Sequence, residues 1–134
     1  MSIPKIVIHT DVIIDFLLHD KESPSVLRMA MRKFFCYTTV FNAIELFSLA
    51  VNKRQVKAIE HALSVFKILG LNARSAKTYG ALFARDLKLP RLNIFIAGLC
   101  LESKLSILTG RPEEFYGIEG LAVLLPSMVF NKIK

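Results

Sequence analysis

The amino-acid sequence predicts an α/β fold, a single-domain three-layer α/β/α sandwich around a central, mainly parallel sheet. Short β-branched runs alternate with segments of helical periodicity, and strands separated by helices are typical of a parallel sheet covered on both faces. The chain has 134 residues, of which 53% are hydrophobic, so one domain can bury about two-thirds of its surface. We expect the domain to span residues 1–126 and residues 127–134 to form a C-terminal tail.

The first half of the chain opens with the β-branched run from Lys5 to His9, which is typical of a buried strand. Thr10 or Asp11 can cap the helix that follows, because apolar residues recur there at helical spacing. Pro24 suits the first position of a second helix, which we expect to end near Lys33. The other elements expected in this half are a strand over 35–39 and helices over 42–51 and 54–69.

The second half follows Gly70-Leu71-Asn72, which is a stop signal for the preceding helix. Residues 73–88 have the pattern of an amphipathic helix, and Pro90 ends it. The basic residues of this helix gather on one side: Arg74, Lys77, Arg85 and Lys88. The remaining elements expected are a small-residue helix over 93–102, strands over 104–109 and 121–124, and one helical turn over 112–115.

Composition excludes several classes of protein. A charged fraction of 22% with high apolar content excludes a disordered chain. The most apolar stretch, residues 92–101, is half of the roughly 20 residues that a membrane span needs, and the N-terminus lacks the pattern of a signal peptide. Cys36 and Cys100 lie in apolar sequence and are expected to be reduced. We therefore expect a cytoplasmic protein without membrane contact.

The net charge of +7 is concentrated in the middle of the chain. Residues 23–91 contain twelve Lys or Arg residues against three acids. A basic surface of this kind attracts polyanions such as an RNA backbone, and the basic helix over 73–88 with Arg91 and Arg111 is the candidate surface. A solvated outer face of a basic protein explains the same charges equally well.

Candidate site residues follow the predicted strands, because ligands of parallel α/β folds bind at the carboxyl ends of the strands. The polar residues at these ends are His9, Thr10 and Asp11 after the first strand and Thr109 and Arg111 after the strand near residue 108. Each also has a purely structural interpretation. Asp11 can serve as a helix cap, and His9 as a hydrogen-bonded residue at a strand end.

Glu45 and Asn93 stand out because their neighbours are apolar. Glu45 lies in Phe-Asn-Ala-Ile-Glu-Leu-Phe, and a buried acid needs a cation, a hydrogen-bond donor or water as its partner. Asn93 opens Asn-Ile-Phe-Ile-Ala-Gly, where it can also act only as a helix cap. Glu45 as a half-exposed helix residue is the corresponding structural alternative.

Five segments occur in an order that resembles a known family. They are residues 6–17, 39–46, 93–101, 107–115 and 120–124. Their succession is similar to that of the PIN-domain family, and most closely to its small VapC-like toxin branch, over residues 3–126. The resemblance implies an α/β/α sandwich with metal-dependent endoribonuclease activity, in which acids hold Mg²⁺ or Mn²⁺ to activate water and neutralise the phosphate.

The resemblance assigns the family's acid positions to four residues of this chain. The first position holds His9, the second Glu45, the third Asn93 and the fourth Arg111, so one of the four remains an acid. Asp11 lies two residues after His9 and is the expected substitute. The residues implied as catalytic and metal-binding are therefore Asp11, Glu45 and Asn93, with His9 as a further ligand. Those implied to contact substrate are Thr10, Thr109, Arg111 and Glu114.

Three hypotheses follow for function. The first is a toxin-type ribonuclease with a weak divalent site. The second is a catalytically silent PIN-like module that binds RNA or a protein partner. Relatives of the toxin branch pair with a small antitoxin and many form homodimers, so the resemblance implies both kinds of partner. The third, a small enzyme acting on phosphorylated metabolites, lacks support because the sequence has no glycine-rich phosphate loop.

Overall fold

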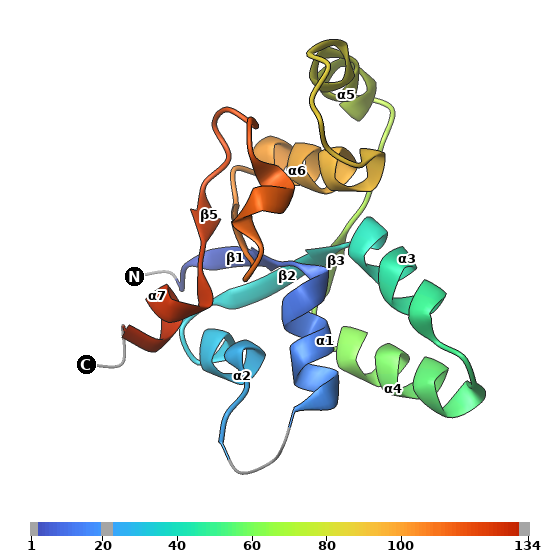
Figure 1. Ribbon diagram of the computed structural model, residues 1–134, viewed down its shortest axis with the longest axis vertical. Coiled ribbons are helices and arrows are strands. Elements are labelled where there is room, and N and C mark those ends of the chain that lie inside the picture. The colour runs from blue at the N-terminus through green and yellow to red at the C-terminus, as the bar shows by residue number, and fades with distance from the viewer. Residues whose placement is uncertain (1–2, 20–22, 132–134) are drawn as a thin grey trace.

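Figure 1 shows a central sheet with helices on both faces, and the computed structural model describes residues 3–19 and 23–131. The strands are β1 (Lys5–Ile8), β2 (Phe35–Thr39), β3 (Lys67–Leu69), β4 (Ser106–Leu108) and β5 (Val123–Leu124). The helices are α1 (Thr10–Leu18), α2 (Val26–Met31), α3 (Val40–Leu49), α4 (Lys53–Leu63), α5 (Ser75–Ala84), α6 (Arg91–Ser103) and α7 (Pro126–Asn131), with a 3₁₀ turn, η1 (Pro112–Phe115).

The five strands form one parallel sheet in the order β3-β2-β1-β4-β5. Strand β1 is central, with Val7 in register with Tyr37 of β2 on one side and Ile107 of β4 on the other. The sheet confirms the expected α/β/α architecture. Because all strands are parallel, their carboxyl ends lie along one edge, and the residues that follow β1, β2 and β4 come together there.

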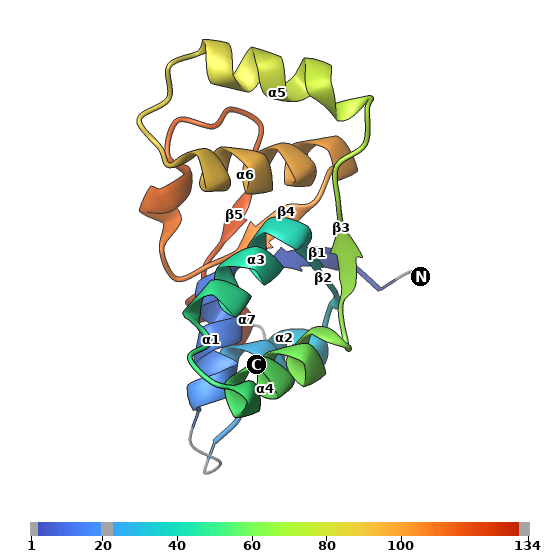
Figure 2. The ribbon, with the colours of Figure 1, turned by 90° about the vertical axis from the view of Figure 1, so that its right-hand side faces the viewer.

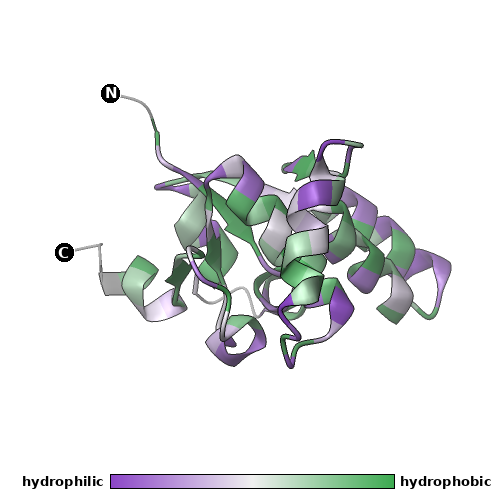
Figure 3. Cartoon of the chain, turned by 90° about the horizontal axis from the view of Figure 1, so that it is seen from above, coloured by the Kyte–Doolittle hydropathy of each residue, from purple (hydrophilic) through white to green (hydrophobic). Residues whose placement is uncertain are grey.

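The sheet has one apolar cluster on each face, and a third cluster lies between α5 and α6. Ile6 and Ile8 of β1 face the cluster formed with α1, α2, α3 and α4. Val7, whose side chain points the opposite way, packs in the cluster formed with α6 and η1. Figure 3 shows the strands coloured mainly hydrophobic, whereas hydrophilic residues gather on the outer helix turns and loops. Burial on both faces explains the continuous β-branched run of β1.

Two elements depart most from the sequence expectations. The helix expected over 54–69 ends at Leu63, and Lys67–Leu69 instead forms strand β3, paired with β2. A strand of three residues is too short to show the alternation of apolar and polar residues. Its sequence therefore looks like a continuation of the preceding helix. The expected tail is a helix in its first part, because α7 packs against α2 with Val129 buried. Lys33 Nζ donates a hydrogen bond to the Val129 carbonyl.

Helix α5 lies on the outer side of α6, away from the sheet (Figure 2). Tyr79 of α5 is buried against Gly98 of α6, and its hydroxyl donates a hydrogen bond of 3.0 Å to the Phe95 carbonyl. A Cβ atom added at Gly98 would overlap the Tyr79 ring. Glycine is therefore required here by the close approach of the two helices. Within the described residues, no helix is long and apolar enough to span a membrane.

Both cysteine thiols are free and buried. Burial raises the pKa of Cys36 to about 11 and that of Cys100 to about 12, from an ordinary value of 9.0. Burial, followed by the nearby charges of Glu102 and Cys100, also raises the pKa of Tyr79. Each group thus keeps its proton in the folded protein at a pH where the unfolded chain loses it.

These shifts predict that stability falls as the pH rises through the alkaline range. The stabilisation is complete below the unfolded pKa of the thiols and is lost between that value and the folded values of about 11 and 12. Urea unfolding at several pH values above 8 measures the slope. A Cys36→Ala, Cys100→Ala variant should show a shallower decline than the native chain. Equal slopes in the two proteins would contradict this prediction.

Candidate functional site

A hollow of about 400 Å³ opens at the carboxyl edge of the sheet, between α1, α3 and η1. The loop from β1 into α1, the middle of α3 and the segment after β4 supply its walls. Its polar lining residues are His9, Thr10, Asp11, Asp15, Glu45, Ser48, Arg111 and Glu114. Four carboxylates therefore face one hollow with a single guanidinium, which makes the hollow electronegative in a protein of net charge +7.

Asn42 is the centre of the hydrogen-bond network beneath this hollow. Thr39 caps α3 and forms a capping box with Asn42, whose Oδ1 accepts from the backbone N–H of Thr39 at 3.2 Å and from its hydroxyl at 2.7 Å. Since Oδ1 is fixed in this way, the Asn42 amide nitrogen points to β1. It donates to His9 Nδ1 at 3.1 Å and to Thr10 Oγ1 at 2.9 Å.

These contacts determine the tautomer of His9. An amide NH₂ can donate but not accept, so His9 Nδ1 carries no proton. The proton then resides on Nε2, which donates to Glu114 Oε1 at 2.9 Å. The ring is 2% exposed and meets Phe115 edge-on, at 4.9 Å between ring centroids. His9 therefore fixes Glu114 through Nε2, and both of its ring nitrogens are in use.

Protein donors also hold the carboxylates of Glu45 and Asp11 in place. Thr10 accepts from Asn42 and donates its own proton to Glu45 Oε1 at 2.5 Å. Asp11, in the first turn of α1, accepts from Thr109 Oγ1 at 3.0 Å and from the Gly110 backbone N–H at 2.7 Å. Asp11 thus ties the start of α1 to the segment after β4, in addition to lining the hollow.

Asn93 lies outside the hollow that contains Asp11 and Glu45. Helix α6 begins at Arg91, so Asn93 falls in its first turn and its side chain turns towards η1. There its Nδ2 donates a hydrogen bond of 3.2 Å to the Glu114 carbonyl. Of the three residues expected to converge, Asp11 and Glu45 line one hollow, whereas Asn93 donates a hydrogen bond to the backbone of η1.

The expected ligands of a Mg²⁺ or Mn²⁺ centre take part in hydrogen bonds within the protein. Such ions take several oxygen ligands, mainly from carboxylates. Both oxygens of Asp11 accept hydrogen bonds from the protein, and one oxygen each of Glu45 and Glu114 does the same. His9 has no free lone pair to offer. In residues 3–19 and 23–131, no group of three or more His, Cys, Asp or Glu side chains is placed to hold a metal ion.

Sequence reasoning missed Asn42 as a site residue. It is fully buried and contacts two of the expected site residues, His9 and Thr10. The spacing Thr-x-x-Asn directly after the second strand is a capping-box pattern, and this signal could have identified the role of Asn42 in holding the start of α3. Its contact with His9 depends on the pairing of β1 with β2 and has no local signal.

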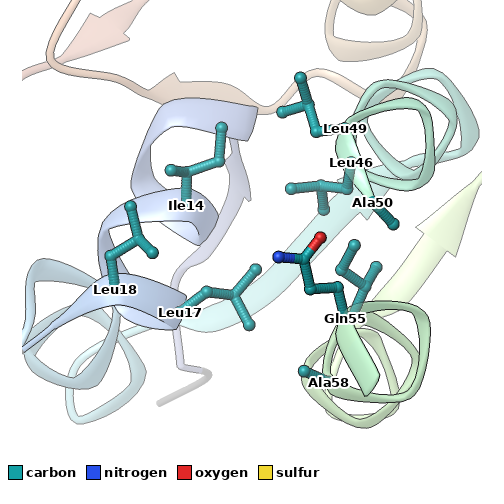
Figure 4. A pocket seen from close by; sticks show the side chains of 9 residues that line it. Ile14, Leu17, Leu18, Leu46, Leu49, Ala50, Gln55 and Ala58 are labelled. Carbon is teal, nitrogen blue, oxygen red and sulfur yellow. The ribbon is translucent and has the colours of Figure 1, made fainter. Parts of the chain in front are cut away.

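An apolar groove of about 290 Å³ adjoins the acidic hollow. Figure 4 shows Ile14, Leu17 and Leu18 of α1 directed towards Leu46 and Leu49 of α3, with Ala58 and Gln55 of α4 below them. Ile14 and Leu49 line both the groove and the acidic hollow, so the two are continuous. Leu18 is 81% exposed and Leu49 is 59% exposed. The groove is therefore an apolar surface open to solvent.

The basic side of the segment over 73–88 is only partly available for a ligand. Arg85 lies 3.4 Å from Glu119, Lys88 lies 3.6 Å from Asp86, and the Arg91 guanidinium lies over the Phe83 ring at 5.3 Å. The helix also ends at Ala84, four residues earlier than expected, with Asp86 in a left-handed conformation. These intramolecular contacts engage Arg85, Lys88 and Arg91.

No family model matches the sequence, and no curated protein matches it either. Solved structures do match the fold. A DNA-bound VapBC complex from Salmonella typhimurium contains a chain with a TM-score of 0.78 and 18% identity, covering 92% of this chain and 98% of that chain. VapBC2 from Rickettsia felis, bound to a DNA fragment from its promoter, gives a TM-score of 0.74 and 16% identity over 90% and 97% of the two chains. The matched chains are VapC toxin components, which are PIN domains. This chain has the PIN-domain fold.

A toxin–antitoxin complex from Klebsiella pneumoniae shares the PIN fold at a TM-score of 0.72 and 21% identity, covering 91% of this chain and 98% of that chain. The match extends over nearly the whole chain, as the sequence resemblance predicted. The carboxyl edge of this PIN fold holds His9, Glu45, Asn93 and Arg111 at the four positions that the resemblance assigned to acids. The fold is thus shared with these structures.

Proposed function

We propose that this chain is the toxin-like component of a two-protein complex, and that its PIN fold serves to bind a small partner protein rather than to cleave RNA with a metal ion. The solved structures with the same fold include toxin–antitoxin complexes. The observation that carries the proposal is the continuity of the exposed apolar groove with the acidic hollow through Ile14 and Leu49.

This combination suits an amphipathic protein segment. The apolar face of a partner helix removes groove residues such as Leu18 and Leu49 from water. A lysine or arginine on the same segment can enter the hollow, where the free oxygens of Glu45 and Glu114 accept its hydrogen bonds. A phosphodiester backbone is repelled by the same carboxylates. The electrostatics of the hollow therefore favour a basic protein segment over RNA.

A designed peptide tests the groove. The probe is a helical peptide of about 20 residues with a leucine stripe and one terminal cluster of lysines, and its affinity is measured by calorimetry. Leu49→Asp should weaken binding about tenfold or more, because it places a charge in the apolar contact. Leu71→Asp is the matched control, since Leu71 is an exposed leucine outside the groove. Equal affinities of the two variants would overturn the proposal.

Metal-dependent cleavage of RNA is the second candidate. It is favoured by the presence of Asp11, Glu45 and Glu114 in the lining of one hollow. Incubation of the native chain with RNA and Mn²⁺ or Mg²⁺ distinguishes the two candidates, and we expect no cleavage above the level of a Glu45→Gln variant. Cleavage by the native chain that Glu45→Gln abolishes would establish the nuclease and overturn the binding-only function.

A further inference from the structure

A second hollow lies between α1, α2 and α4, and the charged side chains that line it within residues 3–19 and 23–131 are basic. Its volume is about 980 Å³, and a smaller hollow of about 390 Å³ shares Phe16, Arg28, Arg32 and His61 with it. Two arginines and two histidines line the larger hollow: His19, Arg28, Arg32 and His61. Among the described residues that line either hollow there is no Asp or Glu. We refer to the pair as the cationic hollow.

The contacts that hold the arginines of the cationic hollow within residues 3–19 and 23–131 include no carboxylate. The Arg28 guanidinium lies over the Phe16 ring at 5.9 Å from its centroid. Arg32 Nη1 lies 3.6 Å from the sulfur of Met29. Neither guanidinium lies within ion-pair distance of a carboxylate in residues 3–19 and 23–131. An anionic ligand would therefore be the first charged partner for both within this part of the chain.

The apolar groove connects the two hollows. It shares Ile14 and Leu49 with the acidic hollow and Leu17 and Ala58 with the cationic hollow. Ile14 and Leu17 lie one turn apart on α1, so the three depressions follow α1 in the order acidic, apolar, cationic. In Figure 4 the groove between the two ends is lined by side chains from α1, α3 and α4. The result is one track with opposite charges at its ends.

We propose that this track recognises a dipolar amphipathic segment of the partner, which places a basic end in the acidic hollow and an acidic end at Arg28 and Arg32. The inference rests on the proposed function, because the segment must first occupy the apolar groove. The inference adds a requirement on charge, because binding to the apolar groove alone does not need a basic and an acidic end. A partner segment with basic residues at both ends would place positive charges against Arg28 and Arg32. This repulsion lowers the affinity for such a partner.

Three peptides with the same leucine stripe test the requirement. The first has lysines at one end and glutamates at the other, the second has lysines at both ends, and the third has glutamates at both ends. The native chain should bind the first peptide about tenfold more tightly than either of the others. In an Arg28→Glu, Arg32→Glu variant the preference should shift to the peptide with two basic ends. An Arg74→Glu, Lys77→Glu variant carries the same change of net charge on α5 and should keep the native preference.

The outcomes separate this inference from the proposed function. If the native chain bound all three peptides with equal affinity and the Leu49→Asp variant bound them more weakly, the preference for a dipolar segment would be overturned. Binding of a partner in the apolar groove would then still stand. Absence of binding for all peptides would overturn both. Binding of a single-stranded RNA that Arg28→Glu, Arg32→Glu removes and the α5 variant keeps would assign the cationic hollow to nucleic acid, and would also overturn the inference.

Discussion

Asn42→Ala should lower the free energy of unfolding by about 3 kcal/mol, because the substitution leaves several buried polar groups without partners. Asn42 is 0% exposed and joins the start of α3 to β1. Its removal deprives the Thr39 backbone N–H of its acceptor and His9 Nδ1 of its donor. Urea unfolding of the variant measures the loss.

Asn52→Ala is the matched control for Asn42→Ala. Asn52 caps α4 through one hydrogen bond of 2.9 Å to the Gln55 backbone N–H and is exposed. Loss of such a cap costs about 1 kcal/mol. The difference between the two variants isolates the contribution of the buried network. Equal destabilisation would show that Asn42 acts as a helix cap alone and would contradict the network described here.

Gly98→Ala should destabilise the protein by about 1–3 kcal/mol, the usual cost of overpacking a core. Alanine within a helix ordinarily stabilises relative to glycine, so the expected sign is reversed. The reason is the Tyr79 ring, which occupies the space of the added methyl group and is held by its bond to the Phe95 carbonyl. Thermal or urea unfolding measures the change.

Gly80→Ala provides the control, because Gly80 lies on the neighbouring helix α5 and has no atom within 4 Å of an added Cβ. There the helix propensity of alanine acts alone and should raise stability by up to about 1 kcal/mol. Opposite signs at Gly98 and Gly80 are therefore expected. Stabilisation by both substitutions would show that α5 moves away from α6 without cost.

Much of the fold follows from local sequence signals. The β-branched run of β1 and the helical spacing after Thr10 predict the first strand–helix unit, and five ordered segments predicted the PIN fold that the solved structures confirm. Such signals lie within each segment, because every strand or helix of the core must carry an apolar face that it can bury. The three-residue strand β3 and the helix α7 carry too few residues for any periodic pattern, so their sequences did not reveal them.

The interior of the candidate site was less predictable, because it depends on contacts between distant segments. The ends of the predicted strands point to His9, Thr10 and Asp11, which line the hollow, yet nothing local shows which partner each residue takes. His9 bonds to Glu114 across 105 positions of the chain and to Asn42 across 33. Asn93 turns to the Glu114 carbonyl because η1 packs against α6. Such pairings are set by the packed fold.

The borders of the sheet have a consequence for how copies of this chain meet one another. The outermost strands, β3 and β5, are short, with three and two residues. Each border therefore exposes few unpaired backbone groups, and a strand from another molecule finds little to extend. Short border strands limit edge-to-edge pairing between copies of a chain that is 53% hydrophobic.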